Sequence, residues 1–104
     1  MKRLEEKLAA LAAAGETITY GALAKELGLR MADFTAQLEA LMEQDAAQGR
    51  PFRAALLRQR LSPDHLPAPG FFLKAAELGQ PTNDPAEFTK AHRDANSMSP
   101  NIPG

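Results

Sequence analysis

The sequence of 104 residues has no cysteine and no tryptophan, and only one tyrosine. Without cysteine the chain forms no disulfide, offers no thiol nucleophile and lacks every zinc site that depends on thiolate ligands. An excess of positive charge is missing as well, because the formal net charge is −1. This balance excludes the overall basic field that drives nonspecific binding to nucleic acids.

Long apolar runs are also missing. None approaches the roughly 20 residues of a membrane-spanning helix, and Glu5 and Glu6 interrupt the region where a signal peptide needs an apolar core. Apolar residues make up 44% and charged residues 24% of the chain, which is ordinary for a globular protein. We therefore expect one small cytosolic domain with no membrane partner.

Recognisable catalytic and ligand-binding patterns are scarce. The sequence has no nucleophile–base pair, no glycine-rich phosphate loop and no carboxylate pair at a convincing spacing. His65 and His92 are far apart and lack a second ligand at helical or turn spacing, so we expect them in solvated loop and tail positions. We predict that the protein is not an enzyme and that it holds no metal, no cofactor and no small-molecule substrate.

The pattern that is present is helical. Three amphipathic helices are predicted in the first half of the chain, over residues 3–14, 20–27 and 31–47. Thr19 suits the N-cap of the second helix, and Gly28 suits the turn into the third. The apolar face of the third helix repeats at three- and four-residue intervals, through Phe34, Leu38, Leu41 and Met42.

The second half alternates apolar segments with turn-forming ones. The run PFRAALLRQRL (51–61) predicts a short strand, with a helix as the alternative, and SPDHLPAPG (62–70) predicts a loop. GFFLKAAELG (70–79) predicts a further helix whose phenylalanines fill the core. The polar tail, 80–104, is expected to be partly disordered or to form a short docking helix capped by Asp84.

The order helix, short strand, tight helix pair, strand, loop, helix resembles a winged helix-turn-helix. We expect a mainly α fold of this kind with a two- or three-stranded β element, a winged helix-like domain over 1–79 and a C-terminal tail over 80–104. The segments TYGALA, LEALMEQDAAQGRP, RAALL and PAPGFFLKAAELG are similar to a pattern in small uncharacterised bacterial proteins of this type. That resemblance covers residues 17–79 and implies no established activity.

The segment TYGALAKELG resembles, more weakly, the helix-turn-helix of alkylguanine-DNA alkyltransferase-like proteins. On that resemblance Tyr20 corresponds to the tyrosine that presses on a DNA phosphate while a base is flipped out. The arginine finger of the family falls at Phe34, however, and the reactive cysteine motif has no counterpart in FRAALLRQR. The resemblance therefore implies neither alkyl transfer nor an arginine finger.

Charge changes sign along the middle of the chain. Residues 30–48 contain four acids and Arg30, whereas residues 49–62 contain four arginines and no acid. The four arginines of the expected wing are Arg50, Arg53, Arg58 and Arg60. Wings and helix entrances commonly meet phosphates. In the alternative, these arginines pair with the acids of residues 33–45 across a hairpin or a dimer interface, or they simply solvate the edge of a strand.

The exposed face of the third helix bears on whether this helix reads DNA. It is expected to carry Ala32, Ala36, Glu39, Ala40 and Glu43, with Gln37 at its edge. Alanine and glutamate cannot make the bidentate contacts to purine edges that specific reading requires. Sequence-specific recognition through this helix is therefore not expected.

Two hypotheses about function follow. In the first, the protein is a non-catalytic winged helix-like module that contacts DNA weakly or nonspecifically through phosphates. Its site would then consist of Tyr20, Arg30, Gln37, Arg50, Arg53, Arg58 and Arg60. In the alternative, the protein is a protein-interaction or dimerisation domain that has lost DNA reading, and the acidic third helix or the tail meets its partner.

Overall fold

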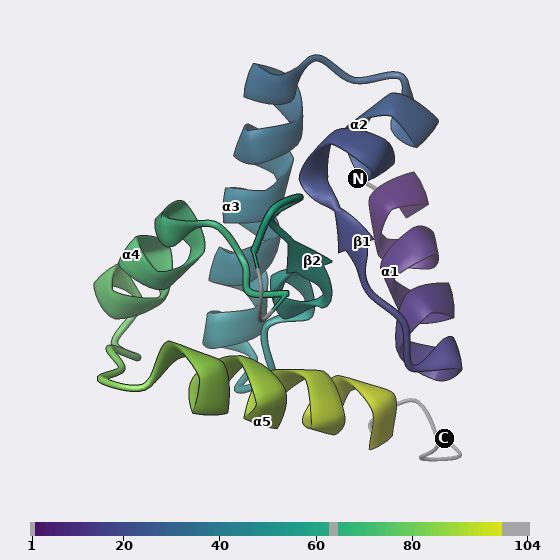
Figure 1. Cartoon of the computed structure of the whole chain (residues 1–104). Helices are drawn as coiled ribbons and strands as arrows, with labels where there is room; N and C mark the ends of the chain where they lie inside the picture. The colour runs from purple at the N-terminus through teal and green to yellow at the C-terminus, as the bar shows by residue number, and fades with distance from the viewer. Residues whose placement is uncertain (1, 63–64, 99–104) are drawn as a thin grey trace.

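Five α-helices, one short 3-10 helix and two short strands make up the part of the chain that this computed structural model describes, residues 2–62 and 65–98. In chain order they are α1 (Lys2–Ala14), β1 (Ile18–Thr19), α2 (Tyr20–Leu27), α3 (Met31–Ala47), η1 (Arg53–Leu56), β2 (Leu57–Arg58), α4 (Pro69–Glu77) and α5 (Pro85–Met98). The mainly helical class predicted from the sequence is confirmed. Figure 1 shows α1 and α2 on one side of α3, α4 on the other, and α5 running beneath them.

The second and third helices begin and end at the predicted residues. Thr19 caps α2, because its hydroxyl Oγ1 accepts a hydrogen bond from the backbone N–H of Ala22 at 3.3 Å. Gly28 ends α2 with a φ of 67°, in the left-handed region that glycine adopts without strain. The tight turn allows α3 to cross α2 and to bury Phe34 between them and the rest of the core.

The short helix η1 lies at the centre of the molecule. Three helices, α1, α3 and α5, pack on it, and Ala54, Ala55 and Leu56 are buried there. Of the segment 51–61, for which a strand was predicted with a helix as the alternative, Arg53–Leu56 is therefore helical and Leu57–Arg58 forms a strand. The small alanine side chains explain the difference, since they let three helices approach a tightly wound segment that a strand of larger residues would hold apart.

The two strands pair in parallel, with Ile18 opposite Leu57. A hairpin wing would require antiparallel neighbours joined by a short turn. Here α2 and α3 lie between the strands in the chain, so the connection is a long crossover and the pairing is parallel. The four arginines expected in a wing are therefore not on a hairpin: Arg50 precedes η1, Arg53 begins η1, Arg58 ends the parallel strand β2, and Arg60 follows it.

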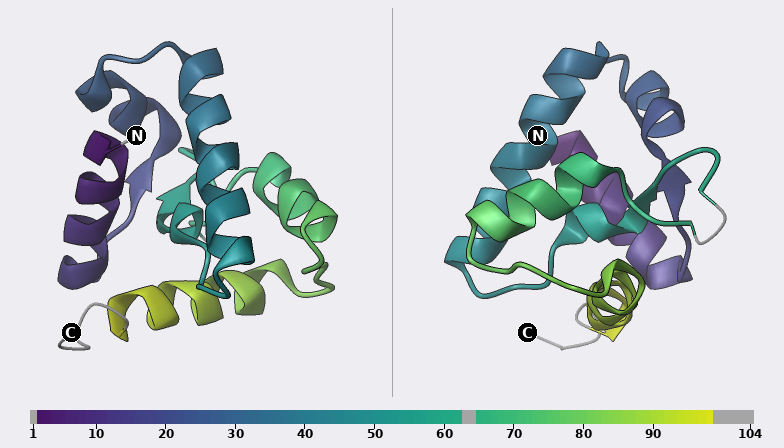
Figure 2. Two further views of the ribbon diagram at one scale, coloured as in Figure 1. Left: turned by 180° about the vertical axis from the view of Figure 1, so that it is seen from behind. Right: turned by 60° about the vertical axis from the view of Figure 1, so that its left-hand side comes forward.

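The tail folds back as α5, a longer helix than the one predicted around Asp84. This carboxylate accepts a hydrogen bond from the backbone N–H of Glu87 at 3.1 Å, and so caps the first turn as expected. Figure 2 shows α5 crossing the lower ends of α1 and α3, and Phe88 and Asn96 pack against the core. The rest of the tail, residues 99–104, lies outside the described residues. None of the described helices combines the length and the apolar character required to cross a membrane.

Candidate functional site

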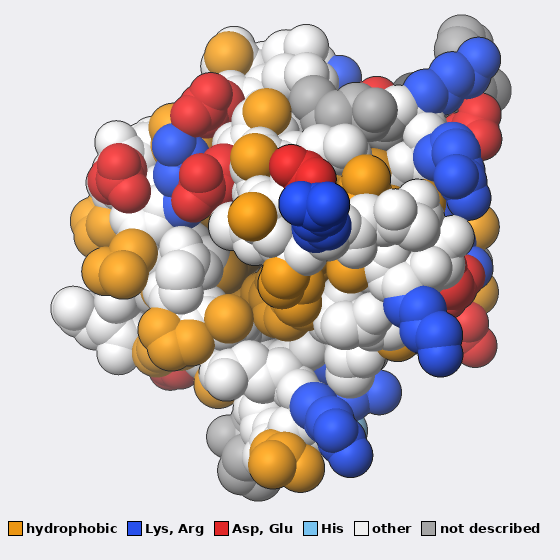
Figure 3. Space-filling model, turned by 90° about the horizontal axis from the view of Figure 1, so that it is seen from above, with side chains coloured by type: hydrophobic (Ala, Val, Ile, Leu, Met, Phe, Trp, Pro, Cys, Tyr) orange, Lys and Arg blue, Asp and Glu red, His pale blue; other side chains and the backbone are white. Residues whose placement is uncertain are grey.

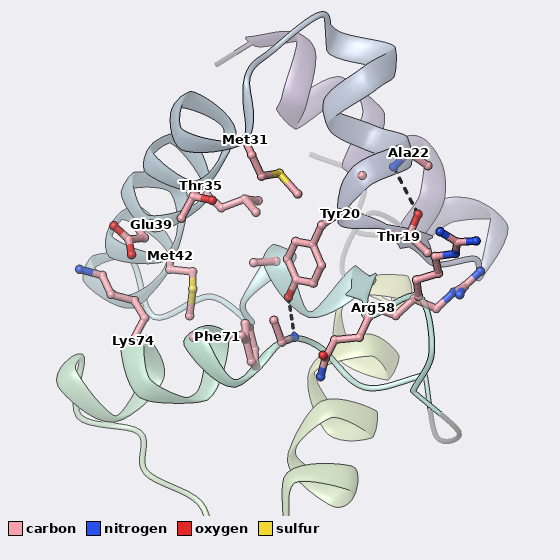
Figure 4. A pocket seen from close by; sticks show the side chains of 17 residues that line it. Thr19, Tyr20, Ala22, Met31, Thr35, Glu39, Met42, Arg58, Phe71 and Lys74 are labelled. Atoms are coloured by element: carbon pink, nitrogen blue, oxygen red, sulfur yellow. Dashed lines mark hydrogen bonds between the residues drawn. The ribbon is translucent and has the colours of Figure 1, made fainter.

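A cleft of about 630 Å³ opens between the first turn of α2, one face of α3, the end of β2 and the first turns of α4. Its volume lies within the roughly 300–1,000 Å³ of ordinary ligand sites. Figure 4 shows side chains from all of these segments converging on it. Neither α1 nor α5 contributes a lining residue.

The floor of the cleft is apolar. Met31, Leu38 and Met42 reach it from α3, and Phe71 reaches it from α4. Leu38, Met42 and Phe71 are largely buried, whereas Met31 has a relative exposure of 50%. Figure 3 shows orange side chains gathered in a hollow of the molecule when it is seen from above. An exposed methionine in an apolar hollow is typical of an adaptable binding surface.

Tyr20, which the sequence marks as a candidate phosphate contact, lies at the centre of the cleft (Figure 4). Its hydroxyl oxygen accepts a hydrogen bond from the backbone N–H of Ala68 at 2.9 Å. Burial raises the pKa of Tyr20, and the hydrogen bond from Ala68 and the charge of Arg93 offset this only in part. The ring therefore joins α2 to the start of α4 and forms a wall of the cleft.

Arg58 and Arg60, two of the predicted wing arginines, line the same cleft. The Nε of Arg58 donates a hydrogen bond to the hydroxyl of Thr17 at 3.2 Å, which holds the half-buried side chain in place. Arg60 is exposed. No carboxylate of the described residues pairs with either arginine.

Arg53 lies outside the cleft and forms internal ion pairs, as the alternative interpretation of the arginines expected. Its guanidinium is 2.8 Å from the fully buried carboxylate of Asp45 and 3.0 Å from that of Glu5. Burial by itself lowers the pKa of Arg53, but the hydrogen bonds and charges of these two carboxylates raise it overall. The same Asp45 also accepts the backbone N–H of Arg53 at 2.9 Å, so the pair fixes the start of η1 on the end of α3.

The remaining predicted site residues are dispersed. Arg30 is exposed at the start of α3, next to Met31 but not in the lining of the cleft. Gln37 lies on another side of α3, in a shallow depression beside the start of α1. Arg50 is exposed and donates to the side-chain oxygen of Gln48. The structure therefore brings together Tyr20, Arg58 and Arg60, and it separates these three from the other four.

The outward face of α3 has the composition expected from the sequence. Ala32, Ala36, Glu39 and Glu43 are exposed, and Phe34 is buried. Of these, Glu39 lines the cleft, and Glu43 forms an ion pair of 2.7 Å with Lys74 of α4. A helix with this surface repels phosphates and offers few donors to base edges.

His92 is not in a solvated tail position, and that prediction was wrong. Its ring is half-buried and stacks on Phe52, with ring centres 5.1 Å apart and an interplanar angle of 11°. The backbone N–H of Phe52 donates to its Nδ1 at 2.8 Å, a bond that requires an unprotonated nitrogen. Exposed His65 lies in a loop as predicted, and no cluster of metal-ligating side chains occurs in the described ranges.

Sequence reasoning missed the cleft itself, including Met31, Glu39 and Lys74. Each of these positions looks like an ordinary helix surface in the sequence, and only the packing of α4 beside α3 turns them into one site. The signal in the sequence that could have indicated the cleft was Met31, a large apolar residue at the edge of the predicted apolar face of α3. No family model, curated protein or solved structure matches the chain.

Proposed function

We propose that the protein is a non-catalytic protein-interaction module whose cleft binds a short segment of a partner protein through apolar side chains. In this proposal the α2–α3 pair is a winged helix-turn-helix-like scaffold that no longer reads DNA. The observation that carries the proposal is the composition of the cleft: an apolar floor of Met31, Leu38, Met42 and Phe71 beside two arginines that have no carboxylate partner among the described residues.

The charged and apolar side chains that line the site favour a peptide over a nucleic acid. Nucleic acids are held by cations that follow the phosphate backbone over a surface. Among the described residues that line the cleft, Arg58 and Arg60 alone are free for such contacts, because Lys74 is paired with Glu43 and Glu39 adds a negative charge. An apolar side chain entering the cleft, in contrast, gains about 25 cal/mol for each Å² that it buries.

Selection from a displayed library of random ten-residue peptides tests the proposal. We expect the protein to enrich peptides with two or more large apolar residues. The variant Thr35→Trp should lose these peptides, because Thr35 is exposed and lines the cleft, which the indole would fill. Ala36→Trp is the matched control, since the neighbouring Ala36 is exposed on α3 outside the cleft. Absence of enrichment, or equal enrichment by both variants, would contradict the proposal.

A second candidate function, contact with nucleic-acid phosphates, is favoured by Arg30, Arg58 and Arg60, which have no acidic partner among the described residues. Fluorescence anisotropy with a mixed-sequence duplex over a salt series tests it. Binding through phosphates weakens steeply as salt rises, and Arg58→Ala with Arg60→Ala should make that slope shallower by about two. Arg53 is left intact, because its loss would strand buried Asp45.

A further inference from the structure

The two ends of the cleft carry opposite charge. Arg58 and Arg60 lie at the end formed by β2 and the residues that follow it. Glu39 and Lys74 lie at the opposite end, between α3 and α4, as Figure 4 shows for the labelled Arg58, Glu39 and Lys74. A ligand that spans the apolar floor therefore meets a different electrostatic environment at each end.

The basic end is suited to a carboxylate. Thr17 holds Arg58 through Nε alone, and a guanidinium has further donors in a planar fork that matches the two oxygens of a carboxylate. Because Arg58 is half-buried, its charge is screened less than that of a fully exposed arginine. Exposed Arg60 adds a second positive charge at the same end.

The acidic end disfavours a second carboxylate. The ammonium group of Lys74 is held by Glu43 at 2.7 Å, and this hydrogen bond raises the pKa of Lys74. The charge of Lys74 is thus already compensated, and the nearby carboxylates of Glu39 and Glu77 leave this end negative. A ligand with acids along its whole length, such as a phosphate backbone, would be repelled here.

We propose that the segment bound in the cleft carries an aspartate or glutamate at the Arg58–Arg60 end, and that Glu39 fixes its direction by favouring a neutral or basic residue at the other end. This inference rests on the proposed peptide-binding function and adds the chemistry of its partner. The apolar floor supplies affinity, and the charges at the two ends supply orientation.

The peptides enriched from the random ten-residue library provide the test. We expect Asp or Glu on one fixed side of the apolar residues and Lys, Arg or neutral residues on the other. Arg60→Glu should weaken the binding of an acidic enriched peptide about tenfold, and it should weaken the variant of that peptide with Asn or Gln in place of the acid far less. Arg50→Glu is the matched control, because Arg50 is exposed outside the cleft.

A second variant covers the opposite end. Glu39→Lys should select peptides with acids on both sides of the apolar residues, and it should remove the preference for one direction. Enriched peptides with no acidic preference, or equal losses for Arg60→Glu and Arg50→Glu, would overturn the inference while leaving peptide binding intact. Failure to enrich any peptide would overturn the proposed function instead, and displacement of an enriched peptide by duplex DNA at low salt would assign the cleft to nucleic acid.

Discussion

The two faces of α3 differ in how they use arginine. On one face, the closed side, α1, α3 and α5 cover η1, and Arg53 is neutralised by Asp45 and Glu5. Arg93 of α5 also serves the fold, because it donates to three backbone carbonyls, those of Ala55, Leu57 and His65. On the other face, the cleft, Arg58 and Arg60 have no carboxylate partner in the described part of the chain.

This difference separates the part of the molecule that stabilises the fold from the part that is free to bind. On the closed side, fully buried Asp45 and partly buried Arg53 compensate each other, so removing one partner strands the other. At the cleft, Arg58 is partly buried, Arg60 is exposed, and neither has a carboxylate partner among the described residues. Changing exposed Arg60 should therefore leave the fold intact and change what the surface attracts. The comparison predicts large stability effects on the closed side and small ones at the cleft.

The largest effect is expected at Asp45. Asp45→Asn removes a fully buried charge that pairs with Arg53 at 2.8 Å, and it should lower the free energy of unfolding by about 3 kcal/mol. Urea denaturation followed by circular dichroism measures the change. Glu43→Gln is the control on the same helix, since it breaks only the exposed pair with Lys74 and should cost less than about 1 kcal/mol. Equal losses of unfolding free energy in the two variants would show that charged pairs on the two faces of α3 contribute equally to stability, which would contradict the comparison.

A smaller effect is expected from pH on the closed side. Burial lowers the pKa of His92 from 6.5, and the carboxylate of Asp45 offsets this only in part. The unfolded chain therefore takes up a proton at a higher pH than the native protein does. Stability should be constant above about pH 7 and should fall as the pH decreases through 6.5 toward the lower native pKa. Urea titrations between pH 7.5 and about 5.5 measure this while most carboxylates stay ionised.

Two variants isolate the contribution of His92. His92→Asn places an amide oxygen where Nδ1 accepts the N–H of Phe52, so it should keep that hydrogen bond and abolish the pH dependence. His65→Asn alters an exposed loop residue and should leave the pH dependence unchanged. If stability still depends on pH in His92→Asn, another titratable group causes that dependence.

The contrast between the two faces also explains what could be predicted from the sequence. Thr19 and Gly28 act within a few residues of their own positions, and the spacing of Phe34 and Leu38 is a local property of one helix. The bounds of α2 and α3 were therefore predictable. The contact between His92 and Phe52 joins residues 40 positions apart, and nothing in the local pattern of either residue indicates it.

The same distinction between local and long-range contacts applies to the candidate site. Acids and arginines in neighbouring blocks suggested internal ion pairs as an alternative, and Arg53 with Asp45 forms one. The sequence did not indicate which arginine would pair and which would stay free, because that depends on the 3-10 turn of η1 and on where β2 ends. Met31, Lys74 and Arg58 line the same cleft only because α4 packs beside α3.

The smallest effect on stability is expected at the floor of the cleft. Met31→Ala removes a side chain that is 50% exposed, so it should change the free energy of unfolding by no more than about 0.5 kcal/mol. Leu41→Ala on the same helix removes a fully buried side chain and should cost about 2–5 kcal/mol. The enriched peptides should nevertheless bind Met31→Ala several-fold more weakly, as measured by fluorescence anisotropy, because their apolar side chains lose a contact. A large loss of stability would place Met31 in the core, and unchanged peptide affinity would remove it from the binding surface.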